Sequence, residues 1–184
     1  MAYNSRQMKK TIALALALAA TAVAQQYTKD GELVLPKDYR QWVFLSSGIN
    51  MTYTNAPVTD PRFENVFVSP VALKGFLSTG TWPDKTVLLL EIRNSGSHAS
   101  NKDGRFQADV VGIEAHVKDS RRGGWAFYQI SKDAQNGKPF PKTAACFTCH
   151  AKNGATDTTF VQFYPTLIET AKKMGTYKDT GDVQ

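Results

Sequence analysis

Apolar residues along this chain gather in short runs in which apolar and polar positions alternate, a pattern typical of β strands with one buried face. The run at Thr86–Asn94 (TVLLLEIRN) is apolar at most positions and predicts a largely buried strand. Arg105–Lys118 is the longest run, and Phe63–Val68 and Trp125–Ile130 predict further strands. Tyr39–Ser47 fits a helix or a strand, and we favour a strand.

The longest strand candidate has two faces of different character. One face is aliphatic and is expected in the core: Val111, Ile113, Ala115 and Val117. The other face is mixed: Val110, Gly112, Glu114 and His116. A carboxylate in such a strand either joins a cross-strand ion pair, for example with Arg93 or Arg105, or lines a pocket. Both interpretations of Glu114 stay open at this point.

Helix signals are fewer. Ser69-Pro70 combines an N-cap residue with proline in the first turn, and the helix that it starts should end before Gly80. A short helix is expected over Cys146–His150, and helical spacing runs from Thr158 to Met174, where Pro165 marks a kink or a new start. Polar segments predict connections: Gly48–Arg62, the mobile loop Ser95–Gly104, and Lys132–Lys142. The fold class is therefore α+β, mainly an antiparallel sheet with a few helices.

The first 24 residues resemble an export signal. Three basic residues (Arg6, Lys9 and Lys10) precede an apolar run from Thr11 to Ala24, which ends in an A-x-A cleavage site. The run is 14 residues long, too short to span a bilayer. Residues 1–24 are therefore expected to be a signal peptide cleaved after Ala24, and the mature protein is expected in the periplasm.

Removal of this leader changes the charge of the chain. The full sequence has a net charge of +6, and loss of the three basic residues lowers it to +3. No dense Lys/Arg patch with interleaved aromatic residues is present, so nucleic acid is not expected as a partner. Residues 25–184 are long enough for one domain with a substantial core.

Near the C-terminal end lies Cys146-Phe147-Thr148-Cys149-His150, a C-x-x-C-H motif typical of c-type haem attachment. In this chemistry each thiol adds to one haem vinyl group, and one helical turn gives the two sulfurs a suitable separation. The next residue, His150, then supplies the proximal ligand of the iron. Covalent haem attachment takes place outside the bacterial cytoplasm, so the motif and the export signal support each other.

Other uses of the two cysteines are less consistent with the sequence. A disulfide between Cys146 and Cys149 would close a very small loop and add little stability. A redox C-x-x-C usually opens a helix in a thioredoxin-like βαβ setting, which this pattern does not provide. A zinc site needs about four ligands, and His98 and His116 stand alone. We therefore predict one covalently attached haem c.

No second axial ligand is evident from the pattern. Met174 falls on an apolar helical stripe, and Met51 falls in a predicted loop. His98 lies in a polar loop, and His116 is more typical of a surface or core histidine than of a ligand. An electron-transfer cytochrome would normally need such a ligand, and a protein without haem would require the motif to be accidental. A five-coordinate iron that binds small molecules is the favoured prediction.

Five segments together resemble the cytochrome P-460 / cytochrome c′-β family: Gly31–Val43 (GELVLPKDYRQWV), Gly112–Ser120 (GIEAHVKDS), Gly123–Ile130 (GGWAFYQI), Cys146–His150 (CFTCH) and Asp157–Pro165 (DTTFVQFYP). The resemblance covers nearly the whole mature chain. It implies a mostly antiparallel sheet, a homodimer, and a high-spin haem bound on its proximal side by histidine alone. The distal face of the haem would be open.

The family contains two functional kinds. P-460 members oxidise hydroxylamine with nitric oxide to nitrous oxide, and a lysine in them is cross-linked to the porphyrin. The c′-β members lack this lysine and bind nitric oxide in an apolar distal pocket. This chain has Leu90 where the resemblance places the lysine. We therefore favour a gas-binding protein, with a hydroxylamine-oxidising enzyme as the alternative. In both cases an electron-transfer protein is a candidate partner.

The resemblance also implies roles around the haem. An apolar distal cap is expected from Phe44, Phe63 or Phe67 together with Leu90. P-460 members carry a pocket carboxylate at the position of Glu114, where burial would raise the pKa and allow a role as a proton relay. Glu114 is thus the candidate catalytic residue and the main argument for the enzyme.

Overall fold

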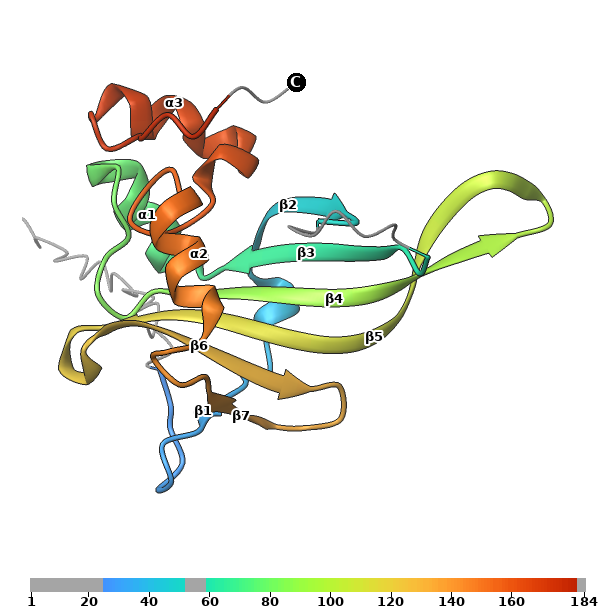
Figure 1. Cartoon of the computed structure of the whole chain (residues 1–184), viewed down its shortest axis with the longest axis horizontal. Helices are drawn as coiled ribbons and strands as arrows, with labels where there is room; N and C mark the ends of the chain where they lie inside the picture. Colours follow the sequence, from blue (N-terminus) through green and yellow to red (C-terminus); the bar gives the residue numbers. More distant parts are fainter. Residues whose placement is uncertain (1–24, 52–58, 182–184) are drawn as a thin grey trace, which may run out of the picture.

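The computed structural model describes residues 25–51 and 59–181 (Figure 1). In these ranges seven strands form one antiparallel sheet in the order β1-β7-β6-β5-β4-β3-β2. Their bounds are β1 Leu33–Val34, β2 Val43–Ile49, β3 Arg62–Val68, β4 Val87–His98, β5 Asn101–Asp119, β6 Gly124–Ser131 and β7 Asn136–Pro139. The predicted signal peptide lies outside the described residues. Among the helices that are described, none is long and apolar enough to cross a membrane.

Three α-helices gather over one face of the sheet, toward one end (Figure 1). They are α1 Pro70–Thr79, α2 Ala145–Asn153 and α3 Pro165–Lys173, with short 3₁₀ turns η1 Tyr39–Gln41, η2 Ser120–Arg122 and η3 Val161–Phe163. This arrangement confirms the predicted α+β class, a mainly antiparallel sheet with a few helices. It also places the C-x-x-C-H segment on a helix, as the sequence predicts.

The two faces of the sheet carry two separate hydrophobic cores. Alternation along β4 divides its residues between them, since Leu89 packs in one core and Leu88 in the other. The first core also holds Ile113, Ala115 and Val117, the aliphatic face predicted for β5. The second core lies under α1 and α3. The functional side of the sheet is this second, helix-covered face.

Helix α1 has sequence signals at both its start and its end, and together they predict its bounds. The Ser69 side chain accepts a hydrogen bond from the Ala72 backbone N–H, and Pro70 occupies the first turn. Gly80 ends the helix in the left-handed region at φ 72°, a conformation that favours glycine. The structure confirms this helix at both ends.

The segment Ser95–Gly104, predicted to be a mobile loop, is instead strand almost throughout. β4 continues to His98 and β5 begins at Asn101, so the two strands form a long hairpin that projects from the body of the sheet (Figure 1). Gly96 and Phe106 are register partners there. The hairpin tip is exposed, so its composition is polar although its backbone is extended and pairs at Gly96–Phe106 and His98–Asn101.

Three further predictions need smaller corrections. The expected strand Tyr39–Ser47 begins as the turn η1 and becomes strand only from Val43. The expected helical stretch Thr158–Met174 is split into η3 and α3, with Pro165 as the first residue of α3. The polar connection Lys132–Lys142 contains the short strand β7.

Candidate functional site

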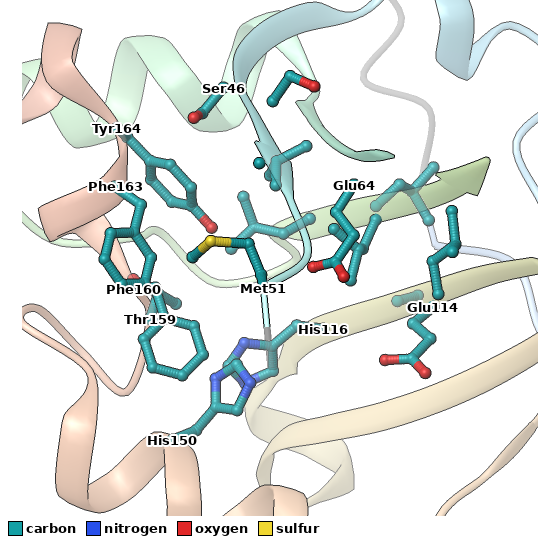
Figure 2. Close-up of a pocket in the computed structure, with 18 of the residues that line it drawn as sticks. Ser46, Met51, Glu64, Glu114, His116, His150, Thr159, Phe160, Phe163 and Tyr164 are labelled. Atoms are coloured by element: carbon teal, nitrogen blue, oxygen red, sulfur yellow. The ribbon is translucent and has the colours of Figure 1, made fainter. Parts of the chain in front are cut away.

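A cavity of about 570 Å³ lies between the helix-covered face of the sheet and the C-terminal segments. This volume falls within the range of roughly 300–1,000 Å³ that is usual for ligand and cofactor sites. Figure 2 shows the two sides: Glu64 and Glu114 come from the sheet, whereas Phe160, Phe163 and Tyr164 come from the C-terminal segments. His150 approaches from α2.

His150 is positioned by a backbone hydrogen bond. Its Nδ1 lies 2.9 Å from the carbonyl oxygen of Thr158, and because a carbonyl only accepts, Nδ1 carries the proton. Burial lowers the pKa of His150 below its ordinary value, although the Thr158 hydrogen bond acts in the opposite direction. The imidazole is therefore neutral at pH 7, and Nε2 keeps the lone pair that a metal ligand needs.

The loop that presents the Thr158 carbonyl is held in an unusual conformation. Asp157 and Thr158 both have positive φ, 50° and 58°. The Asp157 carboxylate accepts hydrogen bonds from Lys118 Nζ at 2.6 Å and from Trp125 Nε1 at 3.1 Å. These bonds tie the loop to β5 and β6 and thereby fix the position of the His150 ring.

Cys146 and Cys149 lie one turn apart on α2, both free and partly exposed. Burial raises the pKa of the Cys146 thiol, and nearby backbone hydrogen bonds oppose this effect. Cys149 Sγ accepts a weak hydrogen bond from Asn153 Nδ2 at 3.4 Å. Neither thiol borders the cavity itself, but the helix that carries them also carries His150, and no residue of this helix is buried.

His116 lies beside His150, a position that the sequence did not predict. Its ring is stacked on Phe127, with centroids 4.1 Å apart and planes at 13°, and its centroid is 4.7 Å from that of His150. The side chain is buried, with 7% of its surface exposed, and its Nε2 has no hydrogen-bond partner. Burial is the main reason that the pKa of His116 is well below its ordinary value, with His150 contributing. A buried polar atom without a partner at a cavity wall fits an occupant that carries polar groups.

Glu114 and Leu90 both reach this cavity. They are register partners on β5 and β4, so they lie side by side on the same face of the sheet. Burial raises the pKa of Glu114. The alternative ion pair is not found in the described residues: Arg93 pairs with Glu91 on the opposite face, and Glu114 has no ionic partner there. The structure thus places Glu114 in a pocket.

Glu64 is a second cavity carboxylate, and the sequence analysis did not identify it. Burial, and next the charge of Glu114, raise the pKa of Glu64 to about 7, while Arg62 acts to lower it. Strand alternation is the sequence signal that could have identified Glu64, because in β3 it shares a face with Val66, which also lines the cavity.

The same alternation places the three candidate cap residues elsewhere. Phe44 is 53% exposed and Phe67 packs against the core on the far face, with Phe44 in edge contact with it. Phe63 has the same strand parity as Phe67, and none of the three lines the cavity. The aromatic lining comes instead from other elements: Phe127, Phe160 and Phe163. Met51, predicted in a loop, also reaches the cavity (Figure 2).

These features fit a haem. The histidine is neutral with an available Nε2, two thiols lie on the same helix at attachment spacing, and the cavity has an apolar lining with an unsatisfied buried nitrogen. They define a class, small haem proteins with a cofactor cavity on one face of an antiparallel sheet. Comparison with known families agrees: the family model Cytochrome P460 matches residues 36–161. The chain belongs to the cytochrome P460 family. A search of curated proteins found no match.

Proposed function

We propose that this protein is a mono-haem c-type cytochrome that binds nitric oxide or a similar small gas at a five-coordinate iron. Cys146 and Cys149 would hold the haem covalently, and His150 Nε2 would be the proximal ligand. When bound, the haem supplies an iron with one open coordination position. The observation that carries the proposal is the neutral His150, fixed through Nδ1, at the wall of a largely apolar cavity.

The aliphatic part of the sheet lining, which comes from β4, supports gas binding. Leu88, Leu90 and Ile92 of β4 all line the cavity. Aliphatic side chains supply no hydrogen bond to a bound ligand, which favours neutral nitric oxide or carbon monoxide over dioxygen. The resemblance places the cross-linking lysine of P-460 members at Leu90, and leucine cannot form that bond.

Hydroxylamine oxidation is the second candidate, and the pair Glu64 and Glu114 favours it. Conversion of hydroxylamine and nitric oxide to nitrous oxide and water releases one proton and one electron. A carboxylate with a raised pKa inside the cavity could accept that proton, the role proposed for Glu114. The electron would leave to a separate partner protein.

The optical spectrum of the ferrous protein, recorded with a pyridine haemochrome assay, tests these proposals. We expect a high-spin c-type Soret band and a normal haemochrome, which would support gas binding by an unmodified haem c. A ferrous band shifted strongly to the red would instead indicate a lysine cross-link and make hydroxylamine oxidation the leading function. A low-spin spectrum would contradict both, since it would show a sixth protein ligand, with Met51 the first residue to substitute.

We also propose that the protein is exported to the periplasm, with cleavage after Ala24, and acts there as a homodimer. The export signal and the requirement for haem attachment outside the cytoplasm support the location. The family resemblance supports the dimer. Intact mass and light scattering of the purified periplasmic protein would test both; an uncleaved or monomeric product would contradict them.

A further inference from the structure

Two carboxylates face the cavity from strands that flank β4. Glu64 of β3 is level with Ile92, and Glu114 of β5 is level with Leu90, so the two lie diagonally across β4 on one face. Figure 2 shows both side chains directed into the cavity. Neither carboxylate is part of the proximal contacts of His150.

The negative charge of this pair is poorly compensated. In the described part of the chain Glu114 has no ion-pair partner, and Arg62, the cation that acts on Glu64, is itself exposed and lies 3.6 Å from Asp60. Burial raises the pKa of Glu114, and burial together with the charge of Glu114 raises the pKa of Glu64 to about 7. Glu64 therefore gains its negative charge as the pH rises through about 7.

An independent observation shows that the cavity is built for an occupant. His116 lies in the same wall, more than nine-tenths buried, and its Nε2 has no hydrogen-bond partner. It is neutral and brings no positive charge to balance the carboxylates. The titratable or charged groups around the pair are few: Arg62 from β3, His116 from β5, Cys146 and His150 from α2, and Tyr164 before α3.

We propose that Glu64 and Glu114 act as a charge filter, which admits neutral or protonated small ligands to the haem cavity and disfavours anions. The inference rests on the proposed haem function and specifies its ligand class: neutral nitrogen oxides, carbon monoxide and protonated amines, as opposed to azide, fluoride or nitrite. A fixed negative charge in a cavity of low effective dielectric repels an anionic ligand strongly enough to weaken binding by about tenfold.

The filter has a defined dependence on pH. Below about pH 7 a proton on Glu64 removes one negative charge, so anions should bind more tightly there. Above about pH 7 Glu64 is ionised, and anions should bind more weakly. Neutral ligands should show little of this dependence.

The test compares an anion with a neutral ligand on the purified holoprotein. Azide affinity of the ferric protein and carbon monoxide affinity of the ferrous protein are measured by optical titration between about pH 5.5 and pH 8, where azide stays anionic. The test variant is Glu64→Gln, which removes one charge at nearly constant volume. The matched control is Glu169→Gln, the same change at an exposed position of α3.

At about pH 8 we expect the ratio of azide affinity to carbon monoxide affinity to rise at least about tenfold in Glu64→Gln. The pH dependence of azide binding should be reduced in this variant, and the control should resemble the wild type. An unchanged ratio with an unchanged pH profile would overturn the charge filter.

If Glu64→Gln does not fold, the wild-type profile decides: azide affinity that falls as the pH rises through 7 supports the filter, and a flat profile overturns it. Failure of carbon monoxide to bind at all would overturn the proposed gas-binding function itself, which makes the two failures distinguishable.

Discussion

At the scale of single residues, the tautomer and orientation of the His150 ring depend on neighbouring residues as much as on the C-x-x-C-H motif. The C-x-x-C-H sequence predicts a histidine ligand, but the proton position follows from the Thr158 carbonyl, which lies eight residues away. Contacts with Phe127 and Phe160, at centroid distances of 4.5 and 4.3 Å, restrict the ring further. These contacts hold the side chain in an orientation that suits the proposed ligation.

We predict that His150→Ala abolishes the five-coordinate spectrum of the holoprotein, because the proposed proximal ligand is removed and, among the described residues, no other imidazole has Nδ1 bonded to Thr158. The measurement is the ferrous and ferric optical spectrum, with haem content determined separately. His98→Ala is the matched control, since His98 lies exposed on the β4–β5 hairpin. A normal spectrum in His150→Ala would remove this residue from its proposed role.

The residues of the cavity were only partly predictable from the sequence. Leu90 and Glu114 were expected near the haem and do line the cavity. The three phenylalanines were predicted as cap residues because they are apolar. Position along β3 decides which face a residue lies on, and Phe63 and Phe67 alternate with Glu64 and Val66. Alternation shows which residues share a face, but only the packing shows which face meets the cavity.

At the scale of elements, the loop between α2 and η3 connects the sheet to His150. Lys118 reaches from β5 to donate to Asp157 Oδ2 and to the Trp82 carbonyl at 2.7 Å. Asp157 and Thr158 hold positive φ angles, which cost energy for residues other than glycine and persist when surrounding contacts enforce them. Lys118 is therefore a positioning residue for the His150 ring.

We predict that Lys118→Met lowers the free energy of unfolding by about 2 kcal/mol, because a partly buried charged hydrogen-bond donor is lost. A looser Thr158 carbonyl should also make the reduction potential more positive, since the hydrogen bond to Nδ1 increases ligand basicity. Urea unfolding and redox titration measure the two effects. Lys173→Met, at the exposed end of α3, is the control. A potential equal to that of the wild type would show that Lys118 has only a structural role.

The elements themselves differ in how far the sequence predicts them. Helix α1 has an N-cap serine, a proline and a terminal glycine, and its bounds follow from these alone. The outer half of the β4–β5 hairpin has no such signal, because a ribbon exposed on both faces needs no apolar alternation. Backbone pairing at Ser95–Gln107, Gly96–Phe106 and His98–Asn101 makes that region strand, and composition does not report such pairing.

At the scale of the whole molecule, the two faces of the sheet have different structural roles. One face carries the cavity, and the other is tied to the N-terminal segment by Glu91, which is 2% exposed. Glu91 accepts hydrogen bonds from the Tyr39 hydroxyl, from Arg40 Nε at 2.9 Å and from Arg93 Nε at 2.6 Å. Burial alone would raise the pKa of Glu91, but these donors and the charges of the two arginines hold it below its ordinary value.

We predict that Glu91→Gln lowers the free energy of unfolding at pH 7 by about 3 kcal/mol, because two arginines lose a buried partner. In the wild type this contribution is complete above the unfolded pKa of 4.5 and is lost as the pH falls through the lower folded pKa. Chemical denaturation as a function of pH measures both effects. Glu169→Gln serves again as the control. The same acid sensitivity in wild type and variant would exclude Glu91 as its source.

Helix α2 has a consequence for how the molecule matures. It has no buried residue and no side-chain cap at its start, and Phe147 and His150 dock it on Phe127 through ring contacts. We expect the sheet to assemble independently of this helix, leaving its two thiols accessible to an attachment enzyme. Covalent bonds to the cofactor would then anchor the helix, so that loading the prosthetic group completes the architecture as well as the chemistry.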